Sequence, residues 1–443
     1  MSHDHPLPPD YWEPLPPMPS ALSDHAVPPL SDVLAGRQIA LLVCGGIAAF
    51  KTPLLARALR KHGAEVTVFA SEDALRYVTP DALAWSSDRS VVRALSARAE
   101  HLGDGQRFDA YLVAPATYNT INKFAAGMAD NLITTVLASA LGQLERGQTR
   151  ILLAPTLHGS MHNTILTQSL LFLQELGVTV LPPRDAYGKH NLPDETEIVY
   201  RTARALSHSP LRGLPVLVTG GPTPVPLDDI RRITTRFTGA LGCEIAKALF
   251  VTGAQVHWVH GQSTFQPPDW LPCTIVDSLQ AYQDAVMQIL AFADCRAAIF
   301  SAAVADYAPA RAVSGKIPSG QPELKLSLQS TAKVVQQVRE SYPELLLVSF
   351  KYEVGLSHAE LMQIARQRLA QSDAVVANRA EEQSQQQQAW LVTSHAPEQR
   401  LQGKPAIAAG IVAWLEEQLT AESVESLELD DPLIDLMPPL FQD

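Results

Sequence analysis

At 443 residues the chain is long enough for two domains with tails, because single domains usually have about 100–200 residues. Hydrophobic residues make up 46% of the chain and charged residues 18%, a balance typical of well-packed cores. The net charge of −12 argues against nucleic acid as a partner, because phosphate binding needs a basic surface. The four cysteines contain no Cys-x-x-Cys pair, so neither a zinc site nor a disulfide framework is expected.

No apolar run reaches the ~18–20 residues that a membrane span needs, and the amino-terminal residues do not resemble a signal peptide. We therefore expect a soluble, cytoplasmic protein that does not associate with membranes.

Both ends of the chain differ in composition from the middle. Residues 1–35 are Pro-rich, with nine of the 33 prolines in the first 30 positions, and are expected to be a disordered tail. The tail 419–443 mixes acidic and apolar residues. Disorder is one interpretation of its last part, 421–443, and the other is a short amphipathic motif, around LIDLMPPLF, that docks on a protein partner.

Strand and helix signals alternate from residue 36 to residue 205. Apolar runs predict strands at 39–44, 64–70, 109–116, 149–156 and 178–183. The spacing of apolar residues predicts helices over 48–64, ending at Gly63, and over 119–141, with Gly127 in mid-helix. This alternation predicts an α/β domain with an open parallel sheet.

The same alternation returns after a linker at 206–214. Strands are predicted at 215–221, 254–261, 273–278, 297–305, 345–350, 373–379 and 389–394. We therefore predict a second parallel-sheet domain over 215–418. The likeness of the two halves reflects a shared fold class and is only weak evidence of duplication.

Each half begins with a strand that ends in two glycines. Gly45-Gly46 follows IALLVC, and Gly220-Gly221 follows PVLVT. Such turns let backbone N–H groups approach a phosphate, but they occur about as often without a ligand. Neither is a Gly-x-Gly-x-x-Gly fingerprint. The stretch 114–132, APATYNTINKFAAGMADNL, follows another strand and places polar side chains at the edge where open α/β sheets bind ligands.

Several motifs occur together in one order: CGGIAAFK, PATYNTINKFAAGMADNLITT, GGPTPVPLDDIRRI and AAVADY. Over residues 37–415 the chain resembles the bifunctional flavoproteins of coenzyme A biosynthesis, in which 4′-phosphopantothenoylcysteine decarboxylase is fused to phosphopantothenate–cysteine ligase. The resemblance implies a flavodoxin-like flavoprotein domain (36–205), then a Rossmann-like ligase domain. It also implies small-molecule substrates and a homo-oligomer.

For the first domain the resemblance implies a site for flavin mononucleotide (FMN) and flavin-dependent decarboxylation. The positions that match the family's flavin segments are Gly45, Gly46, Ile47, Lys51, Ser71, Ala116, Thr117, Asn119 and Met128. His101 stands at the spacing of the family's catalytic histidine, although a lone surface histidine is an equally good reading.

Two expected features of that domain are changed. His158 replaces the substrate-binding Asn of the family's Pro-Ala-Met-Asn loop and is the second catalytic candidate. The family's cysteine-containing flap is replaced by PPRDAYGKHNLPDETEIV, and there is no cysteine between Cys44 and Cys243. No other side chain reproduces thiol redox chemistry, so the family reaction is expected to be altered.

For the second domain the resemblance implies a site for CTP or ATP with Mg²⁺. The matching positions are Gly220, Gly221, Pro222, Thr223, Asp306, Lys316, Phe350, Lys351 and Asn378, with Asp306 as the metal candidate. Lys316 is one lysine where the family has three, and the family's Asn and Lys near Gly239 are absent. Losing cations beside a triphosphate weakens charge stabilisation, so an active and an inactive ligase both stay open.

Three functions follow from this pattern. The first is a divergent enzyme of coenzyme A biosynthesis. The second is an FMN enzyme acting on another cysteine-derived carboxylate, such as a peptide C-terminus. The third is a flavoprotein that has become a binding or regulatory subunit.

Overall fold

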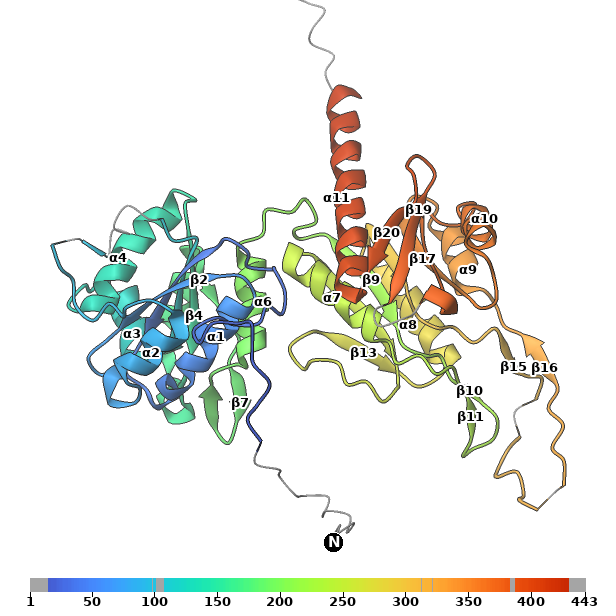
Figure 1. Ribbon diagram of the computed structural model, residues 1–443, viewed down its shortest axis with the longest axis horizontal. Coiled ribbons are helices and arrows are strands. Elements are labelled where there is room, and N and C mark those ends of the chain that lie inside the picture. The colour runs from blue at the N-terminus through green and yellow to red at the C-terminus, as the bar shows by residue number, and fades with distance from the viewer. Residues whose placement is uncertain are drawn as a thin grey trace, which may run out of the picture. The chain divides into compact units, whose positions relative to one another are not determined.

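The computed structural model describes residues 15–97, 99–100, 107–311, 313–320, 322–382 and 387–429. Two compact units divide the chain, Met1–Val199 and Tyr200–Asp443, and Figure 1 shows both. Each unit is an α/β structure built on a parallel sheet, as the sequence predicts. The segment 206–214, predicted as a linker, lies within the second unit, where Leu211 is fully buried.

The first unit contains a five-stranded parallel sheet in the order β2-β1-β3-β4-β6. This order is that of flavodoxin-like folds: the chain adds β2 on one side of β1 and then β3 on the other side, so the strand order reverses between β1 and β3. The strands are fully apolar toward the core, and Leu42, Val113 and Leu153 have 0–1% exposure. The bounds are β1 (Gln38–Val43), β2 (Glu65–Ala70), β3 (Ala110–Ala116), β4 (Arg150–Pro155) and β6 (Thr179–Val180).

The connecting helices bury their apolar faces against this sheet. They are η1 (Ile47–Lys51), α1 (Thr52–Lys61), η2 (Ala74–Arg76), α2 (Pro80–Ser87), α3 (Tyr118–Ala125), α4 (Leu132–Glu145), α5 (Thr164–Glu175) and α6 (Glu195–Ala205), which crosses the division between the units. Three of them, α2, α3 and α5, begin after Thr79, Thr117 and Asn163, whose side chains accept hydrogen bonds from backbone N–H groups of the first turn.

The predicted helix over 119–141 is wrong as a single element. Gly127 has a φ of +70°, which lies outside helical geometry, and α3 ends just before it at Ala125. Asn131 and Thr134 then form a capping box that starts α4. The segment between the two helices is therefore a loop.

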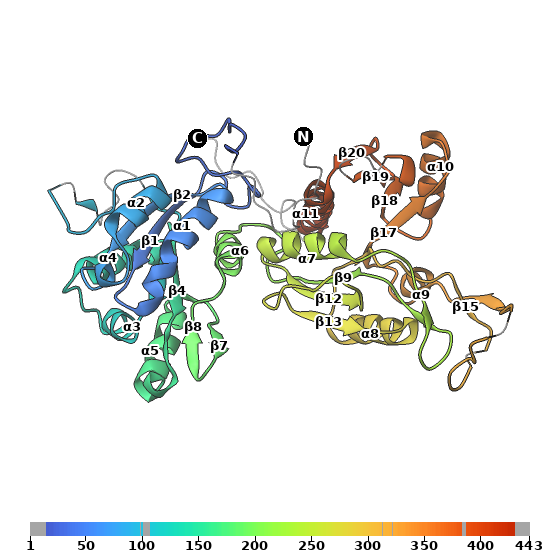
Figure 2. The ribbon, with the colours of Figure 1, turned by 60° about the horizontal axis from the view of Figure 1, so that its bottom comes forward.

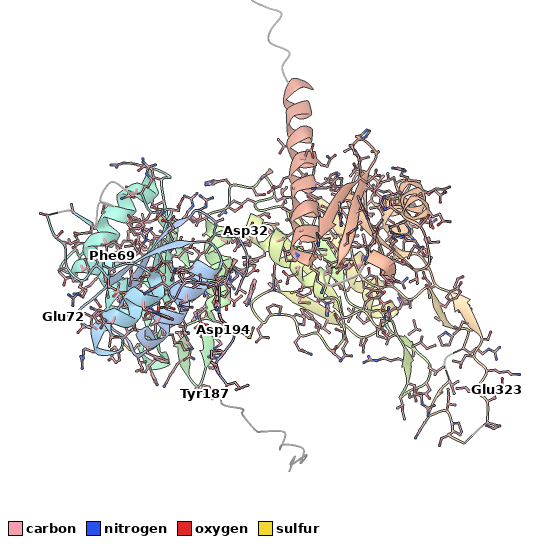
Figure 3. All side chains as sticks on the ribbon, in the orientation of Figure 1. Asp32, Phe69, Glu72, Tyr187, Asp194 and Glu323 are labelled. Atoms are coloured by element: carbon pink, nitrogen blue, oxygen red, sulfur yellow. The ribbon has the colours of Figure 1, made fainter. Side chains whose placement is uncertain are left out.

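A small antiparallel sheet was not predicted from the sequence. It contains β5 (Leu157–His158), β8 (Lys189–Asn191) and β7 (Arg184–Ala186), in that order, with η4 (Gly159–Met161) directly after β5. Tyr187, at the tip of the β7–β8 hairpin, is 96% exposed, and Figure 3 labels it there.

Part of the predicted amino-terminal tail is ordered. The backbone N–H groups of Leu30 and Leu34 donate to the carbonyls of Lys61 and His62 at the end of α1. Leu34 is fully buried, so its apolar side chain fixes this segment to the first unit.

The second unit contains an eight-stranded sheet in the order β13-β12-β9-β14-β17-β18-β19-β20. The first six strands in this order are parallel. β19 is antiparallel to β18, and β20 is antiparallel to β19, an arrangement that the sequence did not predict. The bounds are β9 (Pro215–Gly220), β12 (Gln255–Gly261), β13 (Cys273–Val276), β14 (Ala297–Phe300), β17 (Leu346–Glu353), β18 (Ala374–Arg379), β19 (Gln388–Thr393) and β20 (Gln399–Gln402).

Helices cover both faces of this sheet. Figure 2 shows α7 (Ala240–Thr252) and α8 (Leu279–Phe292) on opposite sides of β9, β12 and β13. The unit also has α9 (Val334–Ser341), α10 (His358–Arg368) and η5 (Ala380–Glu382), and two small antiparallel pairs, β10 (Val225–Pro226) with β11 (Arg232–Ile233) and β15 (Tyr307–Pro309) with β16 (Leu328–Ser330). Glu323, labelled in Figure 3, lies in the long connection between β15 and β16.

The last helix, α11, runs from Lys404 to Leu429. It extends beyond residue 418, at which the predicted second domain ends. The docking segment proposed from the sequence continues to residue 443, and its part after 429 lies outside the described residues. In the described part of the chain, no helix has the length and apolar content needed to cross a membrane.

Candidate functional site

The predicted flavin residues of the first unit lie at the carboxyl ends of β1, β2 and β3. Gly45 and Gly46 follow β1, Ser71 follows β2, and Thr117 follows β3. In parallel strands these ends meet at one edge of the sheet, and the point where the strand order reverses, between β1 and β3, is where open α/β sheets bind ligands. The sequence separates these turns by up to 72 positions, and the fold brings them to the same place.

The two glycines are close to both neighbouring turns. A Cβ atom on Gly45 would lie 2.3 Å from Cβ of Asp73, and one on Gly46 would lie 3.2 Å from Cγ2 of Thr117. Neither glycine has a positive φ, so close approach rather than backbone conformation requires glycine here. The turn leads directly into η1 and α1, where the first N–H groups have no partner within the helix. This edge therefore suits a phosphate group.

Thr117 and Ser71 organise the other two turns. Thr117 begins α3 and accepts a hydrogen bond from the Thr120 N–H at 3.4 Å. Ser71 Oγ accepts one from the Ala74 N–H at 3.2 Å, which leaves its own hydroxyl hydrogen for another acceptor. Asn119 is exposed on the first turn of α3, whereas Ala116 is buried at the end of β3.

Two of the predicted flavin residues are large apolar side chains that are exposed. Ile47 is 70% exposed and Met128 is 47% exposed, an unusual position for large apolar groups. Lys51 is half-buried at the end of η1. A glycine turn, a free hydroxyl and apolar surface together fit a group with a phosphate and a planar ring system.

Cys44 lies just before the glycine turn but cannot serve as a nucleophile. Burial raises the pKa of its thiol to about 11, and hydrogen bonds with the Thr120 side chain and the Thr117 backbone only partly oppose this. A thiol reacts as its thiolate, so at neutral pH Cys44 stays protonated and serves only to pack the core.

Of the two catalytic candidates, the structure describes only His158. His101 lies outside the described residues. His158 is exposed on β5, and its Nδ1 lies 2.7 Å from Oγ of Ser160 and accepts the Ser160 N–H at 3.2 Å. Its Nε2 is the ring atom left for a ligand.

A group of polar residues near His158 was not predicted from the sequence. His162 Nδ1 lies 2.7 Å from His190 Nε2, and His190 Nδ1 lies 2.5 Å from Asp185 Oδ1. His162 is four residues from His158, but His190 reaches it only through the β5-β8-β7 sheet. Such short strands give no periodic signal in a sequence.

In the second unit the nucleotide candidates also gather at the carboxyl edge of the parallel sheet. Gly220 and Gly221 end β9, and the sheet reverses its strand order between β9 and β14. The Gly221 carbonyl accepts the Ala303 N–H at 2.9 Å, and Pro222 forms a bridge with Ala303. Thr223 is buried, and its Oγ1 accepts the Ala305 N–H at 2.8 Å, so Thr223 positions the segment that carries Asp306.

The glycines of β9 lie against buried groups that have no partner. His260 is 0% exposed, and neither its ring nitrogens nor Nε1 of Trp258 has a hydrogen-bond partner in the described part of the chain. A Cβ on Gly239, which begins α7, would lie 2.3 Å from Cε1 of His260. Burial lowers the pKa of His260, so its imidazole is neutral and offers one donor and one acceptor. Unpaired buried groups at a helix start suit a polar ligand.

Lys316 is presented by two loops that are joined by a buried carboxylate. Asp228 Oδ2 accepts the Ile317 N–H at 3.0 Å, and Oδ1 accepts N–H groups of Ile230 and Arg231. Burial opposes ionisation of Asp228, but these hydrogen bonds and the nearby Arg231 outweigh it and hold the pKa of the carboxyl group below its ordinary value. The Lys316 side chain itself is exposed.

The remaining candidates have protein partners. Asp306 is exposed and forms an ion pair with Lys333. Lys351 pairs with Glu353 at 2.6 Å, and Asn378 is buried on β18 opposite Tyr352. Phe350 is half-buried on β17. Among the described residues no group of three or more His, Cys, Asp or Glu side chains could hold a metal ion, so Asp306 alone does not form a protein-only metal site.

Comparison with known protein families also divides the chain into two successive parts. Residues 29–207 match the Flavoprotein family, and residues 211–419 match the DNA/pantothenate metabolism flavoprotein C-terminal domain family. The chain is 36% identical over 353 residues to the coenzyme A biosynthesis bifunctional protein CoaBC of Thermococcus kodakarensis, covering 78% of this chain and 86% of that protein. It is 29% identical to CoaBC of Bacillus subtilis, with the same coverage of both chains.

A solved structure of the DNA/pantothenate metabolism flavoprotein from Streptococcus pneumoniae is 26% identical, with a TM-score of 0.42, and matches 46% of this chain and 100% of that one. The family matches cover both units, and the first relative named above is similar along most of its length. The chain therefore belongs to the family of bifunctional flavoproteins of coenzyme A biosynthesis.

Proposed function

We propose that the first unit binds FMN and decarboxylates 4′-phosphopantothenoylcysteine. The observation that carries this proposal is the convergence of Gly45, Gly46 and Thr117 at the reversal point of the sheet. The glycine turn and the start of η1 would hold the FMN phosphate, and Ile47 and Met128 would contact the ring system. Bound FMN would supply oxidation of the substrate's cysteine-derived part, and His101 and His158 are the residues proposed to act on the substrate.

We also propose that the second unit binds a nucleoside triphosphate, CTP or ATP with Mg²⁺, and joins cysteine to phosphopantothenate. Gly220, Gly221 and the start of α7 would hold phosphate groups, with Lys316 and Lys351 as the cations. Asp306 would contact the metal together with phosphate oxygens, because the described residues contain no group of three or more His, Cys, Asp or Glu side chains that could hold the ion alone.

The experiment for the first unit has two steps. The purified protein should carry FMN, seen as a flavin absorption spectrum and identified by mass after release. With 4′-phosphopantothenoylcysteine it should then release CO₂, measured against a sample without substrate. Failure to bind FMN after reconstitution would contradict both parts of the proposal. FMN binding without release of CO₂ would contradict only the proposed decarboxylation of this substrate.

The experiment for the second unit measures pyrophosphate. Phosphopantothenate, cysteine and either CTP or ATP with Mg²⁺ should give pyrophosphate and phosphopantothenoylcysteine, because activating a carboxylate as an acyl-nucleotide releases pyrophosphate. No product with either nucleotide would contradict the proposed ligation.

One alternative for the first unit has a specific observation in its favour. His158 and the β7–β8 hairpin occupy the segments in which the family's substrate-binding Asn and its Cys are expected, and Tyr187 is almost fully exposed there. A different cysteine-derived carboxylate, such as a peptide C-terminus, would therefore be the substrate if phosphopantothenoylcysteine is inert. Peptides ending in cysteine, assayed for CO₂ in the same way, distinguish the two.

A further inference from the structure

A continuous chain of hydrogen-bonding groups lies on the β5-β8-β7 sheet and the start of α5. Asp185 contacts His190, His190 contacts His162 at 2.7 Å, and His162 Nε2 lies 3.2 Å from Oγ1 of Thr167. Three separate elements contribute these side chains: β7, β8 and the segment that joins η4 to α5. We call Asp185, His190 and His162 the histidine relay.

The backbone fixes the relay in place. Asp185 and His190 are directly opposite in the antiparallel β7–β8 pair, so their side chains lie on the same face. Leu157 pairs with His190 on the other side. The Gly159 N–H donates to the Gly188 carbonyl at 2.9 Å, and the His162 N–H donates to the Gly159 carbonyl at 3.0 Å, which ties the turn after β5 to the hairpin.

The two imidazoles can hold a proton in two arrangements. When both are neutral, His190 donates from Nδ1 to Asp185 and accepts at Nε2 from Nδ1 of His162, whose Nε2 then accepts from the Thr167 hydroxyl. When one proton is added, every bond beyond His190 reverses, and His162 donates from Nε2. A proton taken up at one end therefore appears at Nε2 of His162, with the charge stabilised by Asp185.

Contacts between α5 and α3 link the outer end of the relay to the flavin edge. Asn163 follows His162, and its side chain begins α5 and donates to the Tyr118 hydroxyl at 3.3 Å. Tyr118 follows Thr117, against which Gly46 lies. A second contact, from Ser169 Oγ to Asn122 Oδ1 at 2.7 Å, also joins α5 to α3. The other titratable or charged side chains on the elements that pair with or pack against the relay are His158, Arg184, Lys189, Glu175, Lys123, which pairs with Asp130, and Tyr118.

We propose that His162 is an acid–base group of the flavoprotein unit, and that His190 and Asp185 are its positioning residues. The proposal rests on the decarboxylation proposed above. Loss of CO₂ breaks a C–C bond and leaves the electron pair on the remaining organic fragment, which must take up one proton. The protonated relay supplies that proton from Nε2 of His162, and solvent water returns a proton to the neutral relay. The relay thus provides a proton donor in a segment that contains no cysteine.

The first test compares variants of the full-length, FMN-loaded protein. His162→Gln should lower the rate of CO₂ release about 10²–10³-fold, as general acid catalysis contributes on this scale, and Asp185→Asn should lower it less. FMN affinity and melting temperature should not change in either variant. His395→Gln, which changes an exposed histidine of the second unit, is the matched control and should behave as the unchanged protein.

Two readouts separate proton transfer from a structural role. Added imidazole should restore activity to His162→Gly, because the ring lies at an exposed position that a free base can reach. In the pH profile of CO₂ release, the limb that falls as the relay loses its proton should shift in Asp185→Asn. A His162→Gln variant with full activity, in a protein that releases CO₂, would overturn the proposal and leave the decarboxylase function standing.

A measurement without substrate tests the relay itself. In proteins labelled with ¹⁵N at all 13 histidines, the ring signals of His162 and His190 are identified by their loss in His162→Gln and in His190→Gln. Because the two rings share a hydrogen bond, each substitution should also move the signal of the other ring. Both should move in Asp185→Asn. Ring signals that move neither when the other histidine is replaced nor in Asp185→Asn would show that no relay exists. If the unchanged protein releases no CO₂ while the coupling is present, the decarboxylase function and the catalytic role of His162 both fail, and only the relay's structure is supported.

Discussion

Adding a methyl group at Gly45 tests the flavin edge directly. In Gly45→Ala the new Cβ would lie 2.3 Å from Cβ of Asp73, and non-bonded carbon atoms prefer about 3.5–4.0 Å. The turns after β1 and β2 must therefore separate by more than about 1 Å. Backbone lies close to the same position, because the Asp73 carbonyl carbon would be 3.1 Å away, so a rotamer change cannot relieve the clash.

The expected cost follows from this geometry. Forcing an extra methyl group into a packed site costs about 1–3 kcal/mol, and 1.4 kcal/mol corresponds to a tenfold change in affinity. If the turn opens to relieve the clash, FMN affinity should fall roughly 5- to 150-fold. Gly46→Ala should have a smaller effect, because its Cβ would meet only the Thr117 methyl group at 3.2 Å.

The assay is titration of the flavin-free protein with FMN, followed by quenching of flavin fluorescence, together with thermal unfolding. Gly142→Ala is the matched control, because Gly142 lies inside α4 with nothing within 4 Å of the added methyl group. Alanine is favoured over glycine in a helix by about 0.5–1 kcal/mol, so this variant should bind FMN normally and be no less stable. Unchanged affinity and stability in Gly45→Ala would refute the assignment of the Gly45 turn to the cofactor.

Three further predictions concern titratable groups. Burial raises the pKa of Cys44, Cys243 and Cys295 to about 11 and that of Cys273 to about 12. Iodoacetamide at neutral pH should therefore modify the native protein far more slowly than the unfolded protein. Rapid modification of the native protein would contradict this. Burial lowers the pKa of His260 from 6.5, so in acid the imidazole binds a proton in the unfolded second unit but not in the folded one. As the pH decreases from about 6.5, the free energy of unfolding should therefore decrease by up to about 1.4 kcal/mol per pH unit. Urea unfolding at several pH values should show a shallower dependence in His260→Gln, and identical slopes would count against the buried neutral imidazole. The pKa of Asp228 is lowered from 3.8, so its contribution is present above about pH 4 and lost as the pH falls through the folded-state pKa. Asp228→Asn should therefore lower the melting temperature at neutral pH and change it little near pH 2; an equal loss at both would show that the carboxylate charge is not what joins the two loops.

Much of the scaffold could be predicted because its signals are local. The apolar runs before Gly45 and Gly220 are strands buried on both faces, and their glycine turns lie where parallel strands end. One local signal was misread, since Gly127 was placed in the middle of a single predicted helix but in fact separates α3 from α4. Predicted binding positions such as Thr117 and Gly46 are also brought together by the fold, although this proximity does not by itself show a ligand.

The parts that could not be predicted depend on contacts between distant residues. The β5-β8-β7 sheet is made of strands of two or three residues, too short for any periodic pattern, and it alone brings His190 to His162. The sequence likewise cannot show that the ring nitrogens of His260 lack partners, because there His260 is only one residue of a predicted strand. Partnering and burial of polar groups are properties of the folded chain.

The most direct test of the account is CO₂ release from 4′-phosphopantothenoylcysteine by the purified, FMN-loaded protein. The account predicts one CO₂ for each substrate molecule consumed over many turnovers, with a decarboxylated thiol product that mass spectrometry identifies. A protein that binds FMN at the Gly45 turn, yet releases no CO₂ and leaves the substrate unchanged, would contradict the proposed decarboxylation.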